Sequence, residues 1–217
     1  MTEPQNRRPL KVRSLRIMQA VARKLCAAGL TPNQISIASV IFAILASICI
    51  SNLSKGENAS AWLMPIIAAL FIQCRLLCNL FDGMVAVEGG RGTKSGELFN
   101  DIPDRIADAV LLVSVGYATA PLFLADILGW ICALLAVMTA YIRTLATAIG
   151  APTRFIGPMA KQHRMAILTI ALIFTALESM YTNAFYALYI ALIIIMLGCC
   201  ATVWRRARAA YLYLENM

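Results

Sequence analysis

Long apolar stretches separated by short polar segments limit what this chain can fold into. A helix needs about 20 mainly apolar residues to cross the hydrocarbon core of a membrane. The chain is 60% hydrophobic and only 14% charged, whereas soluble domains are roughly 45–50% apolar and about 25% charged. We therefore expect an all-α integral membrane protein with six transmembrane helices, whose single domain covers residues 1–217. The predicted spans are residues 35–51, 59–87, 96–117, 123–148, 165–177 and 185–204.

A basic amphipathic segment precedes the first predicted span. Residues 1–11 are polar and contain two prolines, so we expect a loose tail there. Residues 12–28 place apolar side chains on one helical face and basic ones on the others, which predicts an interfacial helix. An ordinary soluble helix is the alternative, and the adjoining span disfavours it. The helix-start signal Thr31-Pro32-Asn33 then opens the predicted six-helix bundle, residues 33–204.

The formal net charge is +8, and its distribution predicts the orientation in the membrane. Lys and Arg gather in the N-terminal arm, in the 88–95 and 150–164 segments and after residue 204, whereas the other connecting segments hold only Lys55 as a cation. The positive-inside rule then places both termini on the cytoplasmic side, and we expect a bacterial inner membrane. This arrangement suits a membrane surface better than nucleic acid. We expect no removable signal peptide, because the N-terminus lacks a short apolar core with a cleavage site.

Ionisable and amide residues interrupt the second and third predicted spans. Together with two small residues, they fall at helical spacing on one stripe of each span. The second span has Arg75, Asn79, Asp82 and Ala86, and the third has Gly96, Asn100, Asp104 and Asp108, with Asp101 and Arg105 beside its stripe. Ionisable groups at membrane depth are costly, so this cluster predicts a functional site. Two facing helices joined by the Gly-rich 88–95 segment would direct their oxygen atoms into one cavity near the cytoplasmic side.

The residue types in this cluster indicate metal-dependent chemistry on phosphates. Hard oxygen ligands from Asp and Asn suit Mg²⁺, Mn²⁺ or Ca²⁺, and the small residues let a phosphate or nucleotide approach the backbone. Divalent-metal catalysis on phosphoryl groups is the natural interpretation. The alternative is a structural network of ion pairs. In that network Arg105 would pair with Asp101 and Asp108, and Arg75 with Asn79 or Asp82.

The spacing of these residues resembles the signature of the CDP-alcohol phosphotransferase family. That signature is D-x-x-D-G-x-x-A-R, eight residues, then G-x-x-x-D-x-x-x-D. Residues 79–104 read N-x-x-D-G-x-x-A-V, eight residues, then G-x-x-x-N-x-x-x-D. The spacing is the same throughout, and the residues that agree are Asp82, Gly83, Ala86, Gly96 and Asp104. The departures are Asn79 and Asn100 in place of Asp, and Val87 in place of Arg.

The resemblance implies an activity and a set of partners. An alcohol oxygen would attack the β-phosphorus of a CDP-linked donor, CDP-diacylglycerol in the simplest case, and CMP would leave. Such a reaction belongs to phospholipid biosynthesis. The expected partners include the surrounding membrane lipids. A homodimer is also compatible with the resemblance. The implied cofactor is Mg²⁺ or Mn²⁺, as one ion or two.

The resemblance also implies roles for individual residues. Asp104 would be the general base. The metal ligands would be Asp82, Asn79, Asn100, Asp101 and Asp104, with the two Asn as neutral oxygen ligands. The nucleotide and diphosphate would contact Gly83, Ala86, Gly96, Arg75 and Arg91. The acceptor head group would contact Arg143, Arg154, Lys161 and Arg164, although these four are explained equally well as cytoplasmic topology residues.

The departures from the signature leave other functions open. Two amides in place of carboxylates remove two negative charges, and metal affinity depends on ligand charge. A relative with another donor, or with water as acceptor, is one alternative. A non-catalytic lipid-binding or scaffold protein is another. A transporter is disfavoured, because the polar residues gather towards one membrane face.

Overall fold

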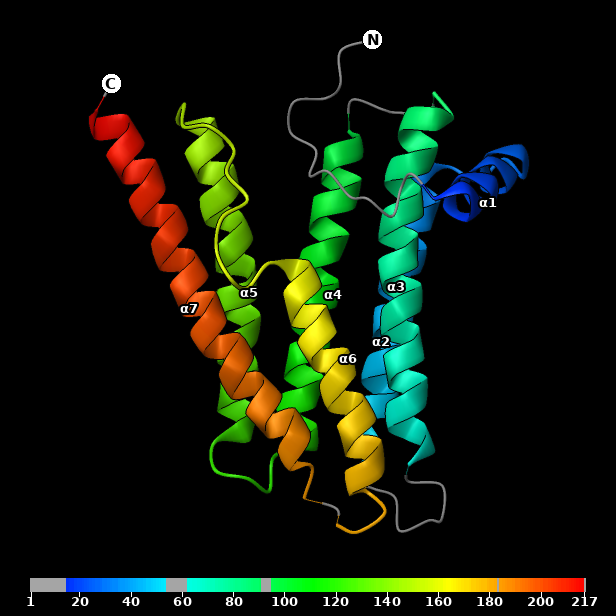
Figure 1. The fold of residues 1–217 in the computed structure, drawn as a ribbon, viewed down its shortest axis with the longest axis vertical. Helices are drawn as coiled ribbons and strands as arrows, with labels where there is room; N and C mark the ends of the chain where they lie inside the picture. Colours follow the sequence, from blue (N-terminus) through cyan, green and yellow to red (C-terminus); the bar gives the residue numbers. More distant parts are fainter. Residues whose placement is uncertain (1–14, 54–61, 91–94, 183, 217) are drawn as a thin grey trace.

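Seven α-helices build the described part of the chain, and that part contains no strand. The structure is a computed structural model that describes residues 15–53, 62–90, 95–182 and 184–216. Figure 1 shows the long helices side by side and a short one lying across one end. The helices are α1 (Arg16–Ala27), α2 (Pro32–Ser51), α3 (Leu63–Glu88), α4 (Gly96–Ala118), α5 (Ala125–Ala148), α6 (Lys161–Glu178) and α7 (Tyr186–Glu215).

Four of the described helices are long and apolar enough to cross a membrane, namely α2, α3, α5 and α7. The other two long helices correspond to predicted spans but are more polar. Helix α4 carries the acidic and basic residues of the polar cluster, and α6 begins with the sequence Lys-Gln-His-Arg. An integral membrane protein is therefore supported, with four helices that meet the criteria of length and hydropathy.

Local sequence explains where several helices begin. Thr31 caps α2 as expected from the Thr-Pro signal: its Oγ1 accepts a hydrogen bond from the Gln34 backbone N–H at 3.3 Å, and Gln34 Oε1 accepts from the Thr31 N–H at 3.0 Å. Helix α6 begins at Lys161, four residues before the predicted span, and α7 runs to Glu215, well past residue 204. Arg and Ala are good helix formers, so α7 continues beyond its apolar stretch.

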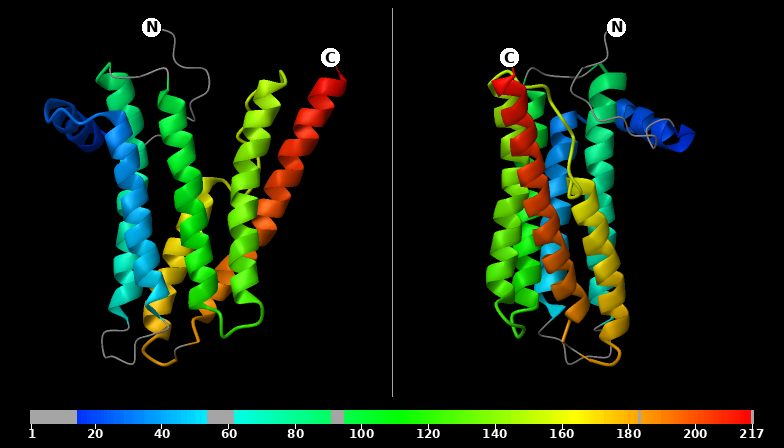
Figure 2. Two further views of the ribbon diagram at one scale, coloured as in Figure 1. Left: turned by 180° about the vertical axis from the view of Figure 1, so that it is seen from behind. Right: turned by 60° about the vertical axis from the view of Figure 1, so that its left-hand side comes forward.

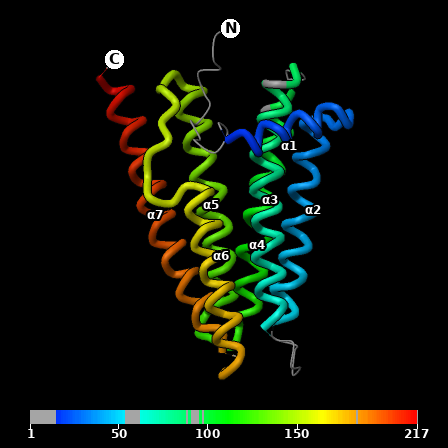
Figure 3. The backbone as a smooth tube through the Cα atoms, turned by 45° about the vertical axis from the view of Figure 1, so that its right-hand side comes forward, coloured from blue at the N-terminus to red at the C-terminus, as the bar shows by residue number. Residues whose placement is uncertain are grey.

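Helix α1 lies across the end of the bundle where α7 ends (Figures 1 and 3). Its Ala22 is fully buried and packs with Leu80 and Met84 of α3. Residues 12–14 of the predicted interfacial helix, and the predicted tail, lie outside the described residues. Helix α1 lies crosswise to the long helices (Figure 3), and its place at a membrane interface stays a prediction.

The long helices share one apolar core, and large apolar side chains also cover the outside. The core draws residues from α2 to α7, among them Ile72, Leu111 and Leu192. Helices α4 and α5 approach closely at Gly116 and Gly129, where an added Cβ would meet backbone atoms of the other helix at 2.8 Å. Helix α6 begins well below the ends of its neighbours, so the segment before it descends into the bundle (Figures 1 and 2). This descent brings the first turn of α6 to the polar residues of α3 and α4.

Candidate active site

Asp108 joins three helices in the polar interior. Its Oδ1 lies 2.6 Å from Arg75 Nη2 on α3, and its Oδ2 lies 2.5 Å from Arg164 Nη2 on α6. All three side chains are at most 1% exposed. Arg164 Nη1 also donates to the Met159 carbonyl oxygen at 3.0 Å. The ion-pair alternative placed Arg75 with Asn79 or Asp82, but the structure pairs it with Asp108, because α4 turns its Asp104–Asp108 stripe towards α3.

Asp104, the predicted base, lies one helical turn before Asp108 and faces two cations. Lys161 Nζ from the first turn of α6 lies 2.5 Å from Asp104 Oδ1. Arg75 Nη2 lies 3.7 Å from the same oxygen and donates to the Asp104 carbonyl oxygen at 3.3 Å. Asp104 therefore lies between a cation of α3 and a cation of α6.

Asp82 is held by α2 and by its own helix. Ser36 Oγ donates to its Oδ2 at 2.7 Å, and the Gly83 backbone N–H donates to its Oδ1 at 2.5 Å. Asp82 is only 3% exposed, and it lies close enough to Asp104 and Lys161 to interact with their charges. Ser36 was not predicted, since no spacing within the sequence connects α2 with Asp82. Only the packing of α2 against α3 brings the two together.

A polar pocket of about 230 Å³ lies beside these residues. It contains the predicted ligands Asn79, Asn100, Asp101 and Asp104 and the predicted acceptor residues Arg143, Lys161 and Arg164. Further lining comes from Arg105, Thr139, Phe155, Gln162 and Arg206. Asp82 is not among the lining residues. The pocket therefore has an amide and carboxylate side on α3 and α4, and a cationic side on α5, α6 and α7.

Asp101 is engaged by arginines. Arg105 Nη2 lies 2.9 Å from Asp101 Oδ1, as the ion-pair alternative expected for this i, i+4 pair. Arg143 Nη2 of α5 lies 3.2 Å from the same oxygen. Arg143 also stacks over the Phe155 ring, with 5.6 Å from its Cζ to the ring centroid. Asp101 thus fixes Arg143 at the pocket wall.

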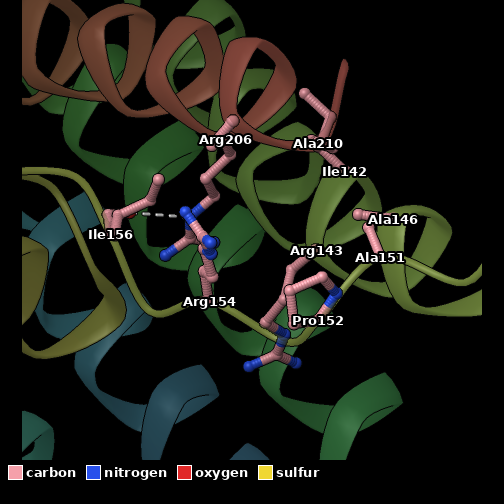
Figure 4. A pocket seen from close by; sticks show the side chains of 10 residues that line it. Ile142, Arg143, Ala146, Ala151, Pro152, Arg154, Ile156, Arg206 and Ala210 are labelled. Atoms are coloured by element: carbon pink, nitrogen blue, oxygen red, sulfur yellow. Dashed lines mark hydrogen bonds between the residues drawn. The ribbon is translucent and has the colours of Figure 1, made fainter. Parts of the chain in front are cut away.

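Arg154 lies apart from the polar pocket, whereas an arginine that was not predicted lines it. Arg154 borders a small cavity of about 20 Å³, together with Arg143 and Arg206 (Figure 4). Arg206 of α7 borders both hollows, and it donates to the Ile156 carbonyl oxygen at 2.9 Å and to that of Thr139 at 2.5 Å. The sequence assigned the basic residues after position 204 to topology alone. The helix-forming residues after position 204 could have indicated that α7 continues and that Arg206 lies on it.

The predicted nucleotide contacts are spread along α3 and the start of α4. Gly83 and Ala86 lie on α3, and Gly96 begins α4, all three half-buried. Arg75 is fully buried and held by Asp108, and Arg91 lies outside the described residues. A nucleotide contact at these positions stays a prediction.

The donor atoms near the pocket fit one hard cation. Among the described residues no group of three or more His, Cys, Asp or Glu side chains is placed to hold a metal ion. The available oxygens are those of the Asp82 and Asp104 carboxylates and of the Asn79 and Asn100 amides. Asn79 Nδ2 is buried without a hydrogen-bond partner, and because it is a donor it suits an acceptor such as a phosphate oxygen and not a cation. The negative charge present suits one divalent ion better than two.

Solved structures share this fold. The structure superimposes on that of Mycobacterium tuberculosis phosphatidylinositol phosphate synthase with CDP-DAG bound, with a TM-score of 0.73 and 21% identity, covering 91% of this chain and 94% of that one. It resembles the same synthase in complex with manganese and citrate, with a TM-score of 0.72 and 20% identity over 89% of this chain and 88% of that one. The chain therefore shares the fold of this phosphatidylinositol phosphate synthase.

Two curated relatives are similar in sequence, and their names describe the same kind of synthase. The chain is 25% identical to archaetidylinositol phosphate synthase of Pyrococcus horikoshii, over 74% of this chain and 79% of that protein. It is 23% identical to phosphatidylinositol phosphate synthase of Mycolicibacterium smegmatis, over 63% of this chain and 59% of that protein. No family model matches the chain. These similarities confirm the resemblance to the CDP-alcohol phosphotransferases that the sequence indicated.

Proposed function

We propose that this protein is a membrane phosphotransferase of phospholipid biosynthesis. It transfers a phosphatidyl-type group from a CDP-linked lipid to an alcohol and releases CMP. The observation that carries this proposal is the position of Asp104. It lies in a pocket between the amides of α3 and α4 and a cationic wall, in the fold of a synthase that binds CDP-DAG.

The membrane arrangement in this proposal has six spans, α2 to α7, with α1 at the cytoplasmic interface and both ends of the described chain on that side of an inner membrane. Helices α4 and α6 are polar, but their ionisable groups pair inside the bundle through Asp108, Asp104, Arg164 and Lys161. Pairing lowers the cost of placing such groups at membrane depth.

The donor side of the pocket takes the diphosphate and one divalent ion, Mg²⁺ or Mn²⁺. Asp82 and the amide oxygens of Asn79 and Asn100 would hold this ion, which when bound neutralises charge on the diphosphate and the leaving CMP. The structural neighbour in complex with manganese supports a divalent cofactor. Gly83, Ala86 and Gly96 have no bulky side chains, so the nucleotide can approach the backbone there.

The cationic wall selects an acceptor alcohol that itself carries a phosphate. Arg143, Lys161, Arg164 and Arg206 line this side, and guanidinium groups bind phosphate through paired N–H donors. The names of both curated relatives, which are inositol phosphate lipid synthases, support this choice.

The reaction then needs one bond to form and one to break. The acceptor oxygen bonds to the β-phosphorus of the donor, and the bond from that phosphorus to the CMP oxygen breaks. The acceptor proton passes to Asp104. Both cations near this carboxylate contact Oδ1, so Oδ2 is the oxygen that accepts the proton.

The test is CMP release by the purified protein in lipid nanodiscs. CDP-diacylglycerol, Mg²⁺ and a panel of alcohols and alcohol phosphates are supplied, and we expect release with a phosphorylated acceptor. Asp104→Asn should abolish it, whereas Asp126→Asn, the same change in the first turn of α5, should not. Absence of CMP release across the whole panel would overturn the proposal.

A non-catalytic lipid-binding protein is the second candidate, and the amides at positions 79 and 100 favour it. If it is correct, Asp82→Ala and Asp104→Ala change thermal stability but leave the phenotype of a complemented deletion strain intact. CMP release that needs no alcohol would instead indicate hydrolysis.

A further inference from the structure

Lys161 lies in an unusual position for a lysine at the start of a helix. It is the first residue of α6, and the descending segment before α6 carries it into the bundle. Its ammonium lies 2.5 Å from Asp104 Oδ1, closer than the 3.7 Å of Arg75, and its side chain is only 21% exposed. A solvated topology residue would extend into water, whereas this one contacts a carboxylate at the pocket.

We propose that Lys161 is a built-in cation of the phosphate site, which occupies the side of Asp104 where a second divalent ion would otherwise bind. This inference rests on the proposed function, because it assigns a role within the same pocket. It goes beyond the acceptor contact expected from the sequence. The site then takes one divalent ion, on the side of Asp82.

Charge balance in the pocket supports this role. Asp104 in the pocket and Asp82 beside it supply two negative charges, and Asn79 and Asn100 supply none. Asp101 also lines the pocket, but Arg105 and Arg143 already neutralise it. Lys161 neutralises the charge of Asp104, so the charge that remains suits a single ion. Three features therefore have the same effect: the amide at position 79, the amide at position 100 and the lysine beside Asp104 each lower the affinity for a second cation.

The chemistry of an ammonium group allows it to replace a metal ion in part. It has three donors. One reaches Asp104, and the others are available to phosphate oxygens, because Lys161 lines the pocket. A lysine binds phosphate as a point charge and needs no coordination geometry. The lysine also leaves Asp104 Oδ2 available for the acceptor proton.

The experiment counts bound Mn²⁺ by electron paramagnetic resonance on the full chain in nanodiscs, without substrate. We expect at most one Mn²⁺ per wild-type chain. Lys161→Met and Lys161→Gln free the Asp104 carboxylate, so each should lower the dissociation constant for a second Mn²⁺ about tenfold, which corresponds to about 1.4 kcal/mol. The control Arg208→Met removes the same charge from an exposed position of α7 that does not line the pocket, and should change nothing.

A double variant shows whether the effect passes through Asp104. In Lys161→Met with Asp104→Asn the gain in Mn²⁺ affinity should vanish. Two tightly bound ions in the wild type would overturn the proposal without any variant, as would unchanged affinity in folded Lys161 variants. This readout is independent of turnover. A protein that releases no CMP but gains Mn²⁺ in Lys161→Met contradicts the proposed function alone.

Discussion

At the scale of single residues, Asp108 is the carboxylate on which the polar interior depends. Each of its oxygens accepts a hydrogen bond from a different, fully buried arginine, one on α3 and one on α6. Removing one partner of a buried ion pair costs about 3–5 kcal/mol, because an unpaired charge stays behind. Here two arginines would lose their nearest carboxylate together.

Asp108→Ala should therefore lower the midpoint of thermal unfolding strongly, by the equivalent of at least about 3 kcal/mol. Asp108→Asn should lower it less, because the amide still offers one acceptor oxygen. Asp126→Ala, at the start of α5, serves as the control for loss of a carboxylate. The measurement is thermal unfolding in one detergent, followed by tryptophan fluorescence. Equal midpoints for Asp108→Ala and Asp126→Ala would contradict the assignment.

The amides near the pocket give a second prediction at this scale. Asn79→Asp and Asn100→Asp each add a negative charge among the proposed ligands, so each should strengthen Mg²⁺ binding, and the pair more than either alone. Isothermal titration measures this affinity. Asn33→Asp adds the same charge in the first turn of α2, away from the pocket lining, and should leave it unchanged. If all three variants behave alike, Asn79 and Asn100 are not ligands.

Residue patterns in the sequence were enough to find the polar cluster but not its pairing. The spacing of four from Asn100 to Asp104 to Asp108 predicted one helical stripe, and the structure has it on α4. The partner of Asp108 could not be predicted, because Arg164 is 56 residues away and its approach depends on how α6 enters the bundle. The contact of Ser36 with Asp82 depends in the same way on packing between helices.

At the scale of elements, the descending segment and α7 act together. Gly157 has a φ of +111°, and an added Cβ would lie 2.6 Å from Thr202 Cγ2 of α7. Thr202 Oγ1 also accepts a hydrogen bond from the Met159 N–H at 2.9 Å. Arg206 binds the Ile156 carbonyl one helical turn further on. Helix α7 thus fixes the segment that delivers Lys161 and Arg164.

Arg206→Ala should raise KM for the phosphorylated acceptor at least about tenfold, as expected for loss of a charge-assisted contact of about 1.5–3 kcal/mol, while KM for the CDP-linked donor changes little. The neighbouring residue supplies the control, since Arg205 is exposed and lines neither arginine-bordered pocket. Steady-state kinetics with both substrates varied separates the two effects. An equal rise in both KM values would mean that Arg206 supports the fold and not the acceptor side.

The ends of the elements show where sequence reasoning stops. Helix-start signals such as Thr31-Pro32 are local, so the first residue of α2 could be predicted. The length of α7 could not, because hydropathy measures where a helix meets lipid and not where it ends. The same limit hid Arg206, which lies beyond the apolar stretch but on the continuing helix.

At the scale of the whole molecule, the six long helices are apolar outside and partly polar inside. Exposed apolar side chains such as Ile41, Leu134 and Leu197 face outwards, while Asp108 and Arg164 are paired in the interior. A helix that is too polar to cross a membrane alone can do so within such a bundle when its polar groups find partners there. This is why α4 and α6 fall outside the hydropathy criterion and still belong to the proposed set of spans.

The proposed topology makes a prediction about accessibility from the two sides of the membrane. In a variant without the seven native cysteines, single cysteines at Ser95 and Asn216 should react with a membrane-impermeant maleimide only from the cytoplasmic side. Ser95 lies where α4 begins, and Asn216 lies where α7 ends. Tyr181 lies between α6 and α7, and its side chain is 90% exposed. Tyr181→Cys should react only from the opposite side.

Inverted and right-side-out vesicles from the same cells provide the two orientations, and mass tagging on a gel measures the labelled fraction. Six spans place Ser95 and Asn216 on one side, because an even number of crossings separates them. If only the four helices of high hydropathy crossed, α5 and α7 would still place Ser95 and Asn216 on one side and Tyr181 on the other, so a fourth position is needed. Phe123, between α4 and α5 and 80% exposed, distinguishes the two arrangements: six spans place it opposite Ser95, whereas four spans place it on the same side as Ser95. Labelling of Phe123→Cys and Tyr181→Cys from one side, and of Ser95→Cys and Asn216→Cys from the other, therefore supports α4 to α7 as four successive spans, and any other pattern contradicts it.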